Sequence, residues 1–195
     1  MDEAAHEKVS FDDEPLILVD EQDNEIGYRS KGDCHAGHGT LHRAFSIFLF
    51  DGRGRVLLQQ RSASKPLWPL YWSNSCCSHP RRGERMEQAL HRRLREELGL
   101  DAPLEFVYKF IYQADFDDVG AEHELCHVYI GAAGGAVRVH PEEIADWKWV
   151  PIDEVTRELS NSPELYTPWF KMEWEALMEK CPDRIRKLKQ EAARA

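Results

Sequence analysis

The sequence lacks any apolar stretch long enough to cross a bilayer. A membrane-spanning helix needs about 20 consecutive, mostly apolar residues. No hydrophobic run in this 195-residue chain approaches that length, although 42% of the residues are hydrophobic. The chain also opens without the pattern of a secretory signal peptide. We therefore expect a cytoplasmic globular protein that has no membrane partner.

The chain also lacks a positive charge balance. Its 35 acidic residues outnumber its 25 lysines and arginines, which gives a formal net charge of -10 and a pI near 5.4. Because an acidic protein repels the phosphate backbone, we expect no nucleic-acid partner. A local group of basic residues could still bind a small anionic substrate. The acidic surface is compatible with a monomer.

Cysteines are few and show no disulfide framework. The five, at positions 34, 76, 77, 126 and 181, are an odd number, and adjacent Cys76 and Cys77 are poor disulfide partners. This usage fits a reducing compartment such as the cytoplasm. The chain contains no internal repeats or linkers, and its length suffices for one domain with a sizeable core.

Hydrophobic periodicity and turn residues predict a single α/β domain. We expect residues 1–14 to be a disordered acidic tail, 15–182 the folded domain and 183–195 a basic helical tail. Gly99 should end the first long helix as its C-cap. Strands are expected at 15–20, 25–29, 41–50, 55–60, 104–114, 122–132, 137–139 and 147–150, helices at 83–99, from 151 onward and at 168–192, and irregular segments at 31–40 and 61–69.

Residues 71–80, Tyr-Trp-Ser-Asn-Ser-Cys-Cys-Ser-His-Pro, concentrate two thiols and a histidine after an aromatic turn. Pro80 cannot donate to a strand ladder, and Ser and Asn favour turns. We therefore expect an irregular loop that presents side chains, and not a core strand. Since cysteine is also a common small buried hydrophobe, the thiols alone leave a packing role open.

The helix expected at 83–99 carries two charges on its apolar side. On a helical wheel, Arg93 and Glu97 fall inside the apolar arc and are neighbours four residues apart. A solvated ion pair is the ordinary interpretation. A pair that faces the core costs several kcal/mol unless a metal or an anionic ligand compensates it. The apolar arc consists of Met86, Ala89, Leu90, Leu94 and Leu98.

Three histidines and two glutamates could form a metal site. Glu122 and Glu124 are two apart in an expected strand, so both side chains should point to one face. Imidazole and carboxylate donors together suit Zn²⁺, Mn²⁺ or a similar ion. The spacing of His35, His42 and His79 matches no zinc-finger pattern, and nine histidines in the chain allow chance sets.

Four basic residues lie near the same loops. Lys31, Arg61, Lys65 and Arg93 each fall at an expected strand end, loop or helix face that borders this region. Arginine binds phosphate through two parallel hydrogen bonds, and lysine binds it as a point charge. Any one of them is more simply a solvated surface residue. The four indicate a phosphate-binding site only if the fold brings them together.

Residues 78–100 resemble the Nudix box, a loop-helix-loop motif of the form G-x5-E-x7-R-E-U-x-E-E-x-G-U. Ser78 replaces its leading glycine, and Arg93 replaces the first glutamate of its R-E-U-x-E-E core. That glutamate helps to bind the metal for pyrophosphate hydrolysis, so its absence argues against hydrolase activity. The matching residues are Glu84, Arg92, Leu94, Glu96, Glu97, Gly99 and Leu100.

With these departures the sequence is similar to the type I isopentenyl-diphosphate delta-isomerases, one branch of the Nudix fold. The resemblance runs from about residue 16 to residue 175, and its Asn-Ser-x-Cys-x-His-Pro and Glu-x-Glu pieces are specific in combination. The matching pieces are Lys31-x3-His35-x6-His42-Arg-Ala-Phe-Ser, Arg61-Ser-Ala-Ser-Lys65, Trp68-Pro, Trp72-Ser-Asn-Ser-Cys-Cys77-Ser-His79-Pro, Tyr112, Glu122-His-Glu124-Leu-Cys and 162–169 with its Pro-Trp ending.

The resemblance implies a Nudix fold with a mixed β-sheet sandwiched between helices in one domain. It implies conversion of isopentenyl diphosphate to dimethylallyl diphosphate in isoprenoid biosynthesis. It implies Mg²⁺ with the diphosphate near Glu97 and a second divalent ion, Mn²⁺, Zn²⁺ or Mg²⁺, at the His/Glu site. The implied roles are catalytic for Cys77, Glu124, Tyr112 and Trp169, substrate-binding for Lys31, Arg61, Lys65 and Arg93, and metal-binding for His35, His42, His79, Glu122, Glu124 and Glu97.

This reaction needs two proton-transfer groups on opposite sides of the substrate chain. We hypothesise that Glu124 with Tyr112 protonates the alkene and Cys77 removes the C2 proton, although the sequence leaves the direction of each transfer open. Trp169 would offer its π face to the carbocation-like state. Cys76 takes a variable family position and is expected to pack. The alternatives are a Nudix hydrolase of a nucleoside diphosphate derivative and a non-catalytic metal-binding module.

Overall fold

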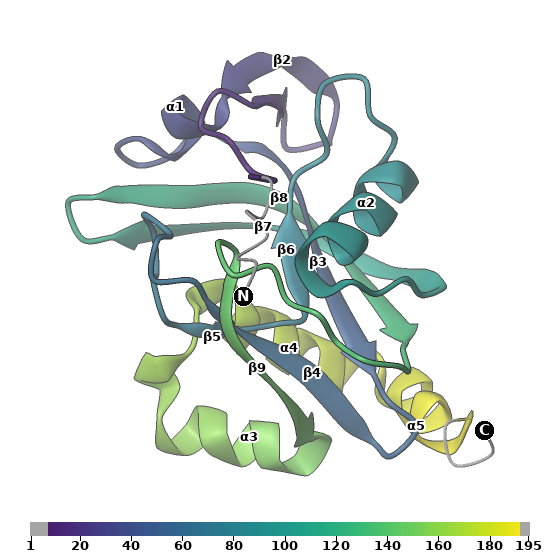
Figure 1. The fold of residues 1–195 in the computed structure, drawn as a ribbon. Coiled ribbons are helices and arrows are strands. Elements are labelled where there is room, and N and C mark those ends of the chain that lie inside the picture. Colours follow the sequence, from purple (N-terminus) through teal and green to yellow (C-terminus); the bar gives the residue numbers. More distant parts are fainter. Residues whose placement is uncertain (1–7, 192–195) are drawn as a thin grey trace, which may run out of the picture.

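The computed structural model describes residues 8–191 as a mixed sheet with helices around it (Figure 1). Within these residues, no helix has the length and apolar character that a membrane crossing requires. The elements are β1 (Pro15–Val19), β2 (Glu25–Ser30), α1 (Lys31–His35), β3 (His42–Phe50), β4 (Arg55–Arg61), β5 (Trp72–Ser73), β6 (Cys76–Ser78), α2 (Met86–Leu98), β7 (Leu104–Phe116), β8 (Gly120–Ala132), β9 (Ile144–Pro151), α3 (Ile152–Asn161), the short 3-10 helix η1 (Pro163–Leu165), α4 (Pro168–Lys180) and α5 (Pro182–Glu191).

Strand β3 is the centre of the sheet. It pairs in parallel with β8 from His42 to Phe50, and antiparallel with β6 on its other side. Its hairpin with β4 is held by the single pair Phe50–Val56, and β4 pairs with β9 along its whole length from Arg55 to Arg61. A strand buried on both faces has a nearly continuous apolar sequence, and the run from Ala44 to Phe50 fits that description.

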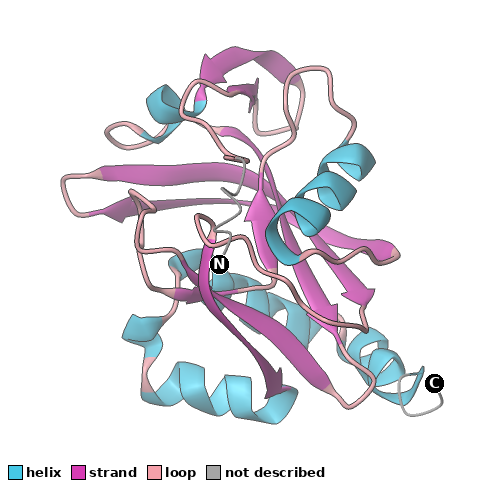
Figure 2. Ribbon diagram, in the orientation of Figure 1, coloured by secondary structure: helices cyan, strands magenta, loops and turns pink. Residues whose placement is uncertain are grey.

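Helices α2 and α4 cover opposite faces of β3. Phe45, Ile47 and Leu49 belong to the hydrophobic cluster that α2 completes with its buried leucines. Phe48 and Phe50 point the other way, into the cluster built on the aromatic residues of α4. Figure 2 shows helices on both sides of the strands. The prediction of a mixed sheet sandwiched between helices in one domain is confirmed.

Helix α2 ends as the sequence predicts. Gly99 adopts a left-handed conformation with φ of 63°, and its N–H donates to the carbonyls of Leu94 and Arg95. Glycine reaches this conformation without a steric penalty from Cβ. The helix begins at Met86, later than the expected Gly83, because Gly83 itself has a positive φ of 76° in the preceding turn.

Two segments expected to be irregular contain regular structure. Residues 31–35 form α1, whose N-cap Ser30 accepts a hydrogen bond from the Asp33 N–H at 3.2 Å. Residues 72–73 and 76–78 form β5 and β6, so the prediction that 71–80 is an irregular loop is wrong for Cys77. Pairing with β3 orders β6, and a three-residue strand has no local hydrophobic alternation that could predict it.

Two further predictions of secondary structure are wrong. Residues 137–139 form no strand, because the Arg138 N–H donates to Leu98 at the end of α2 and not to a strand neighbour. The helix expected at 168–192 is two helices that meet at Cys181. Pro182 lacks an N–H and its ring clashes with the preceding turn, which ends α4 and starts α5.

The acidic N-terminal segment makes defined contacts from residue 8 onward. Gly32 N–H donates to Asp12 O at 2.9 Å, Lys31 N–H donates to Glu14 O at 2.8 Å, and Glu14 pairs with Arg81. The prediction of disorder is therefore wrong for residues 8–14. Residues 1–7 and 192–195, the remaining ends of the two predicted tails, lie outside the described residues.

Candidate active site

A cavity of about 280 Å³ lies between α1, the 61–71 loop, β6 and the start of β8. Every predicted catalytic residue and every predicted substrate-binding residue lines it. Among the predicted metal ligands, His42 and Glu97 are the two that do not reach its surface. The fold therefore gathers side chains from residues 31 to 169 around one space.

Five residues of this region form a compact cluster of metal-type ligands. One ligand atom from each lies within 4.8 Å of all the others. Strand register explains part of this, because His42 is the parallel partner of Glu124, and Glu122 lies two residues before it on the same face of β8. The cluster consists of His35 in α1, His42 in β3, His79 after β6, and Glu122 and Glu124 in β8.

Backbone carbonyls set the orientation of two imidazoles. His35 Nδ1 lies 2.7 Å from Lys31 O, and His42 Nδ1 lies 2.7 Å from Thr40 O. Since a carbonyl only accepts, each Nδ1 carries a proton and each Nε2 points into the cluster. Burial acts to lower the pKa of His35, but the Glu122 carboxylate outweighs it and raises this pKa, whereas His42 stays neutral and keeps a lone pair on Nε2. His42 Nε2 is buried and has no hydrogen-bond partner among the described residues. An inward lone pair of this kind fits a divalent cation.

Charges within the cluster also favour a cation. His35 Nε2 lies 2.8 Å from Glu122 Oε2, so two electron-rich atoms face each other unless a proton or a metal lies between them. Burial lowers the pKa of His42 to about 4, with His35 contributing. Burial acts to raise the pKa of Glu122, but His35 outweighs it and lowers it to about 2. A neutral imidazole and an ionised carboxylate are the ligand forms that metals require.

Cys77 lies in β6 with its thiol at the cavity surface. Its Sγ donates to Asn74 Oδ1 at 2.7 Å and accepts from Trp169 Nε1 at 3.3 Å. Burial raises the pKa of Cys77 to about 12, and Glu173 adds to the effect. In this environment the sulfur holds its proton, and the indole N–H and the Ser73 hydroxyl at 3.7 Å are the donors that can stabilise a thiolate.

Cys76, the neighbouring residue, faces the other side of the sheet. Cys76 is the antiparallel partner of Ile47, and Cys77 is the partner of Ser46. Directly paired residues share a face, so Cys76 enters the core beneath α2, where it is fully buried. The expectation that Cys76 packs agrees with this position.

Glu124 connects the metal-type cluster to Tyr112. Tyr112 is its antiparallel partner on β7, and the Tyr112 hydroxyl donates to Glu124 Oε2 at 2.7 Å. The other oxygen, Oε1, lies 3.0 Å from His79 Nε2. Burial raises the pKa of Glu124 well above its usual range, and the nearby Glu122 carboxylate adds to this effect. The Glu124 carboxyl group can therefore bind a cation through one oxygen while its other oxygen accepts the hydrogen bond from Tyr112.

Trp169 forms one wall of the cavity and is held on several sides. Its indole N–H lies 3.0 Å from Ser73 Oγ, and its ring meets Trp68 edge-on at 5.2 Å. The Arg61 guanidinium lies 5.2 Å from the Trp169 ring centre and donates to the backbone carbonyls of Leu67 and Trp68. Arg61 thereby links the basic end of the cavity to its aromatic wall.

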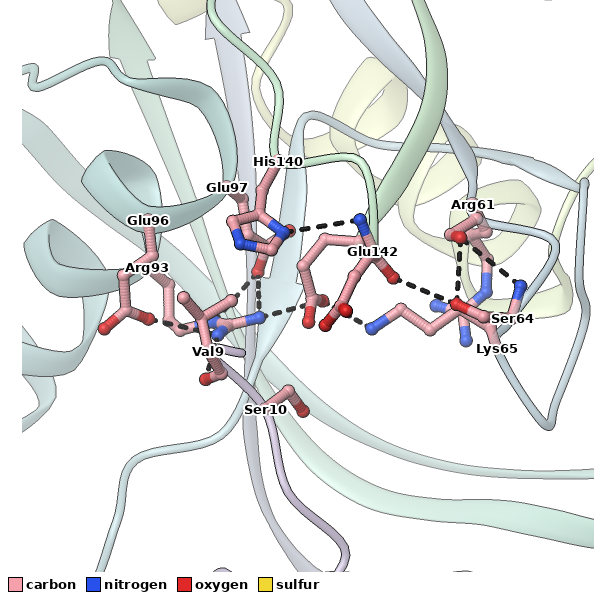
Figure 3. Close-up of polar contacts among 12 residues, drawn as sticks. Val9, Ser10, Arg61, Ser64, Lys65, Arg93, Glu96, Glu97, His140 and Glu142 are labelled. Atoms are coloured by element: carbon pink, nitrogen blue, oxygen red, sulfur yellow. Dashed lines mark hydrogen bonds and ion pairs between the residues drawn. The ribbon is translucent and has the colours of Figure 1, made fainter. Parts of the chain in front are cut away.

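Arg93 is buried in the basic end of the cavity, as the helical wheel predicts. It is 3% exposed, and its partner Glu97 is 2% exposed at an N–O distance of 2.7 Å. The pair is compensated by Glu96 at 3.0 Å and by the Val9 carbonyl at 2.9 Å (Figure 3). Glu143 adds a further contact to the Arg93 guanidinium at 3.0 Å. Groups of the chain itself thus compensate the buried charges of Arg93 and Glu97, in addition to any bound ligand.

Lys31 and Lys65 complete the basic end. Lys31 bonds to Ser10 of the N-terminal segment, and Lys65 pairs with Glu143. Burial lowers the pKa of Lys31 to about 8, and the positive charge of Lys65 contributes. Both lysines line the cavity, as Arg61 and Arg93 do.

The sequence analysis missed two buried carboxylates. Glu143 lines the cavity at 5% exposure, but Glu142-Glu143 looks like a solvated turn in the sequence. Glu173 in α4 is fully buried and contacts Cys126 Sγ at 3.4 Å. The wheel that identified Arg93 and Glu97 could have found it, because Glu173 falls between Trp169 and Phe170 on the apolar side of α4.

Comparison with known proteins first defines the class. A model of the NUDIX domain matches residues 40–170. The crystal structure of DR0079 from Deinococcus radiodurans superposes with a TM-score of 0.69 at 21% identity, covering 83% of this chain and 98% of that one. A MutT NUDIX hydrolase from Burkholderia pseudomallei gives 0.56 at 21% identity, covering 70% and 97%. These likenesses establish the fold.

Curated relatives then define the family. An isopentenyl-diphosphate Delta-isomerase of Photorhabdus laumondii is 42% identical over 174 residues, which are 88% of this chain and 99% of the relative. The enzyme of the same name from Serratia proteamaculans is 49% identical over 158 residues, 81% and 88% of the two chains. The protein belongs to the isopentenyl-diphosphate Delta-isomerase family within the NUDIX domain class.

Proposed function

We propose that this protein interconverts isopentenyl diphosphate and dimethylallyl diphosphate. The observation that carries the proposal is the cavity itself. The Cys77 thiol and the Glu124–Tyr112 pair line one space, and four basic residues line its other end. A short alkenyl diphosphate needs an apolar compartment with proton-transfer groups and a cationic compartment for its phosphates.

The reaction adds a proton at the terminal alkene carbon and removes one from C2. We assign the addition to Glu124 together with Tyr112, whose hydroxyl is hydrogen-bonded to it at 2.7 Å. We assign the removal to Cys77. Acceptance by sulfur requires that the Cys77 thiol first release its proton to solvent, and the Trp169 indole N–H at 3.3 Å from Sγ supplies a donor for the resulting thiolate. Positioned groups of this kind contribute about 10²–10⁴-fold to rate.

Protonation of an alkene passes through a state with positive charge on a tertiary carbon. Trp169 lines the cavity with the Cys77 sulfur near its indole nitrogen, so its ring borders the reacting carbons. The electron-rich face of an indole stabilises a desolvated cation by about 2 kcal/mol. Trp68 and Ser73 hold the ring in place. Aromatic walls also keep water from the carbocation-like state.

The His/Glu cluster fits a divalent ion, which we propose to be Mn²⁺, Zn²⁺ or Mg²⁺. When bound, such an ion would acidify a proton carried by Glu124 or by Tyr112. The residues that would hold it are His35, His42, His79, Glu122 and Glu124. We further propose that Mg²⁺ enters with the diphosphate near Glu97, whose oxygens are the hard donors that Mg²⁺ prefers. Lys31, Arg61, Lys65 and Arg93 would bind the phosphates themselves.

We also infer that the protein acts as a cytoplasmic monomer. All five cysteines are free thiols, as a reducing compartment allows. The acidic net charge of -10 opposes non-specific association with nucleic acids and between copies of the chain.

Incubation with isopentenyl diphosphate and Mg²⁺ tests the function directly. The expected product is an allylic diphosphate, which decomposes in acid whereas the substrate survives, and no phosphate is released. Phosphate release without an acid-labile product would support a hydrolase instead. Absence of both reactions in metal-loaded protein would support a binding module.

A further inference from the structure

Several carboxylates meet at Arg93, but they do not face the same space. Glu96, Glu97 and Glu143 each contact its guanidinium. Of these acids, Glu143 alone lines the cavity. Glu97 does not line the cavity, and its Oε1 accepts from both Arg93 Nε at 2.9 Å and Arg93 Nη2 at 2.7 Å (Figure 3). The carboxylate presented to a bound diphosphate is therefore that of Glu143.

Glu143 is held firmly at the start of β9. Its N–H donates to His140 O at 3.0 Å, and its carbonyl accepts from the Ser62 N–H at 2.9 Å. The side chain is 5% exposed, and its Oε2 accepts both from Arg93 Nη2 at 3.0 Å and from Lys65 Nζ. Hydrogen bonds to its backbone and ion pairs to its side chain thus fix the position of this carboxylate.

A buried carboxylate at this place is unfavourable for a diphosphate on its own. It repels the ligand's negative charge and occupies the Lys65 ammonium that would otherwise bind a phosphate oxygen. The arrangement becomes favourable when a divalent cation comes with the ligand, because Mg²⁺ binds one or two carboxylates together with substrate phosphates. Glu97 and Glu143 both lie within hydrogen-bond distance of Arg93 Nη2, so a second acid lies close by.

We propose that Glu143 binds the divalent cation that accompanies the diphosphate, releasing Lys65 to the phosphates as it does so. This inference rests on the proposed function for the identity of the diphosphate end. Glu143 would then be a second protein ligand of this cation besides Glu97, and one that faces the substrate. The donor set of carboxylate and phosphate oxygens suits Mg²⁺, and the His/Glu cluster is a separate site of mixed imidazole and carboxylate donors.

Binding of inorganic pyrophosphate by calorimetry tests the proposal without turnover. Glu143→Gln is compared with wild type, both with the His/Glu site loaded, in buffers with and without Mg²⁺. With Mg²⁺ we expect pyrophosphate affinity to fall at least tenfold in the variant. Without Mg²⁺ we expect affinity to stay the same or increase, because a repelling charge has been removed.

Other patterns would overturn the proposal. Equal weakening in both buffers would mean that Glu143 only holds Lys65 in position. Unchanged or tighter binding in both would mean that Glu143 is only a competing anion. Glu142→Gln is the matched control, since it removes the same charge from the adjacent exposed residue and should change neither affinity.

A second variant guards against simple misfolding. Glu143→Asp keeps the charge on a shorter arm and should recover part of the Mg²⁺-dependent affinity that Glu143→Gln loses. No recovery in a variant that unfolds at the wild-type temperature would contradict a role in cation binding. Failure of the wild type to isomerise isopentenyl diphosphate would refute the proposed function and leave the pyrophosphate measurements unchanged.

Discussion

Cys76 and Cys77 are chemically identical neighbours that occupy opposite environments. Strand β6 alternates its side chains, so Cys77 reaches the cavity while Cys76 is sealed beneath α2. Burial raises the pKa of both thiols, and only the Cys77 thiol contacts the Asn74 amide oxygen and the Trp169 indole. Its position in the fold, and not the intrinsic reactivity of a cysteine, therefore suits Cys77 rather than Cys76 for proton transfer.

Replacement of each cysteine by alanine separates the two roles. Cys77→Ala should lower isomerase turnover by about 10²-fold or more, because a proton-transfer group is lost. Cys76→Ala should keep turnover near wild type and lose about 1 kcal/mol of stability from the small cavity it leaves. Steady-state kinetics, metal content and thermal unfolding measure these effects. A fully active Cys77→Ala variant would show that the assignment is wrong.

Leu70 is an unusual residue for its backbone position. It has a φ of 63°, the left-handed region, and its side chain is 51% exposed in the loop that carries Trp68. A non-glycine residue pays about 1–2 kcal/mol for this conformation. The loop therefore holds strain next to the aromatic wall of the cavity.

Leu70→Gly should relieve that strain. We expect its free energy of unfolding to match or exceed that of the wild type by up to about 1 kcal/mol, since the relief outweighs the entropy cost of glycine. Leu165→Gly is the control, because Leu165 is 52% exposed with an ordinary negative φ and should lose about 1 kcal/mol. Denaturant unfolding compares them. Equal losses in the two variants would argue against strain at Leu70.

Pairs of elements, rather than single elements, assemble the metal-type cluster. The β3–β8 register sets His42 beside Glu124, and the β7–β8 register sets Tyr112 beside Glu124. Helix α1 completes the cluster by laying His35 against the first residue of β8. That close approach depends on Gly120, where an added Cβ would lie 2.4 Å from the His35 carbonyl oxygen.

Gly120→Ala should displace α1 from β8. The methyl group cannot fit against rigid backbone, so we expect a loss of about 2 kcal/mol in stability and weaker binding of the divalent ion. Competition with a chelating dye measures the metal affinity. Gly134→Ala is the control, because nothing lies within 4 Å of its added Cβ and its φ is not positive. Wild-type metal affinity in Gly120→Ala would contradict this account of α1.

At the scale of the whole molecule, the sheet and α4 enclose an acid with no role in the proposed reaction. Glu173 Oε1 contacts Cys126, and Oε2 has no hydrogen-bond partner among the described residues. Burial raises the pKa of Glu173 from its ordinary 4.5 to about 8, and a contact with Ser46 opposes this. The surrounding titratable groups are Cys77 on β6, Glu124 and Cys126 on β8 and Tyr108 on β7, whose own pKa values Glu173 raises.

This acid should make global stability depend on pH. Between pH 4.5 and 8 the unfolded chain has lost the Glu173 proton while the folded chain retains it, so stability falls as pH rises. Glu173→Gln removes this slope. Relative to wild type, its free energy of unfolding should rise from pH 5 to pH 8 by on the order of 3 kcal/mol.

The change with pH is the informative quantity here, because any fixed cost of burying the amide is the same at both values. Denaturant unfolding at pH 5 and pH 8 measures it. Glu175→Gln, at an exposed position on the same helix, should follow the wild-type slope. A Glu173→Gln variant with that same slope would show that Glu173 is already ionised in the folded protein.

Most strands and the position of α2 followed from sequence alone, because hydrophobic alternation and a glycine cap are local signals. The inward placement of Arg93 and Glu97 followed from the helical period. The proximity of Glu122 and Glu124 on one face followed from the strand period. The family, too, was predicted from the motifs around Cys77 and Glu124, and relatives that are 42% and 49% identical over most of the chain confirm it.

Tertiary structure alone decided which side chains share the cavity. Strand β6 exists because β3 lies beside it, and residues 8–14 are ordered because Arg93 and Lys31 bind them. Glu143 reached the cavity through its contact with Arg93, a residue far away in the chain. Such contacts leave no periodic trace in the sequence, since a single long-range pairing constrains two positions and not the pattern around them.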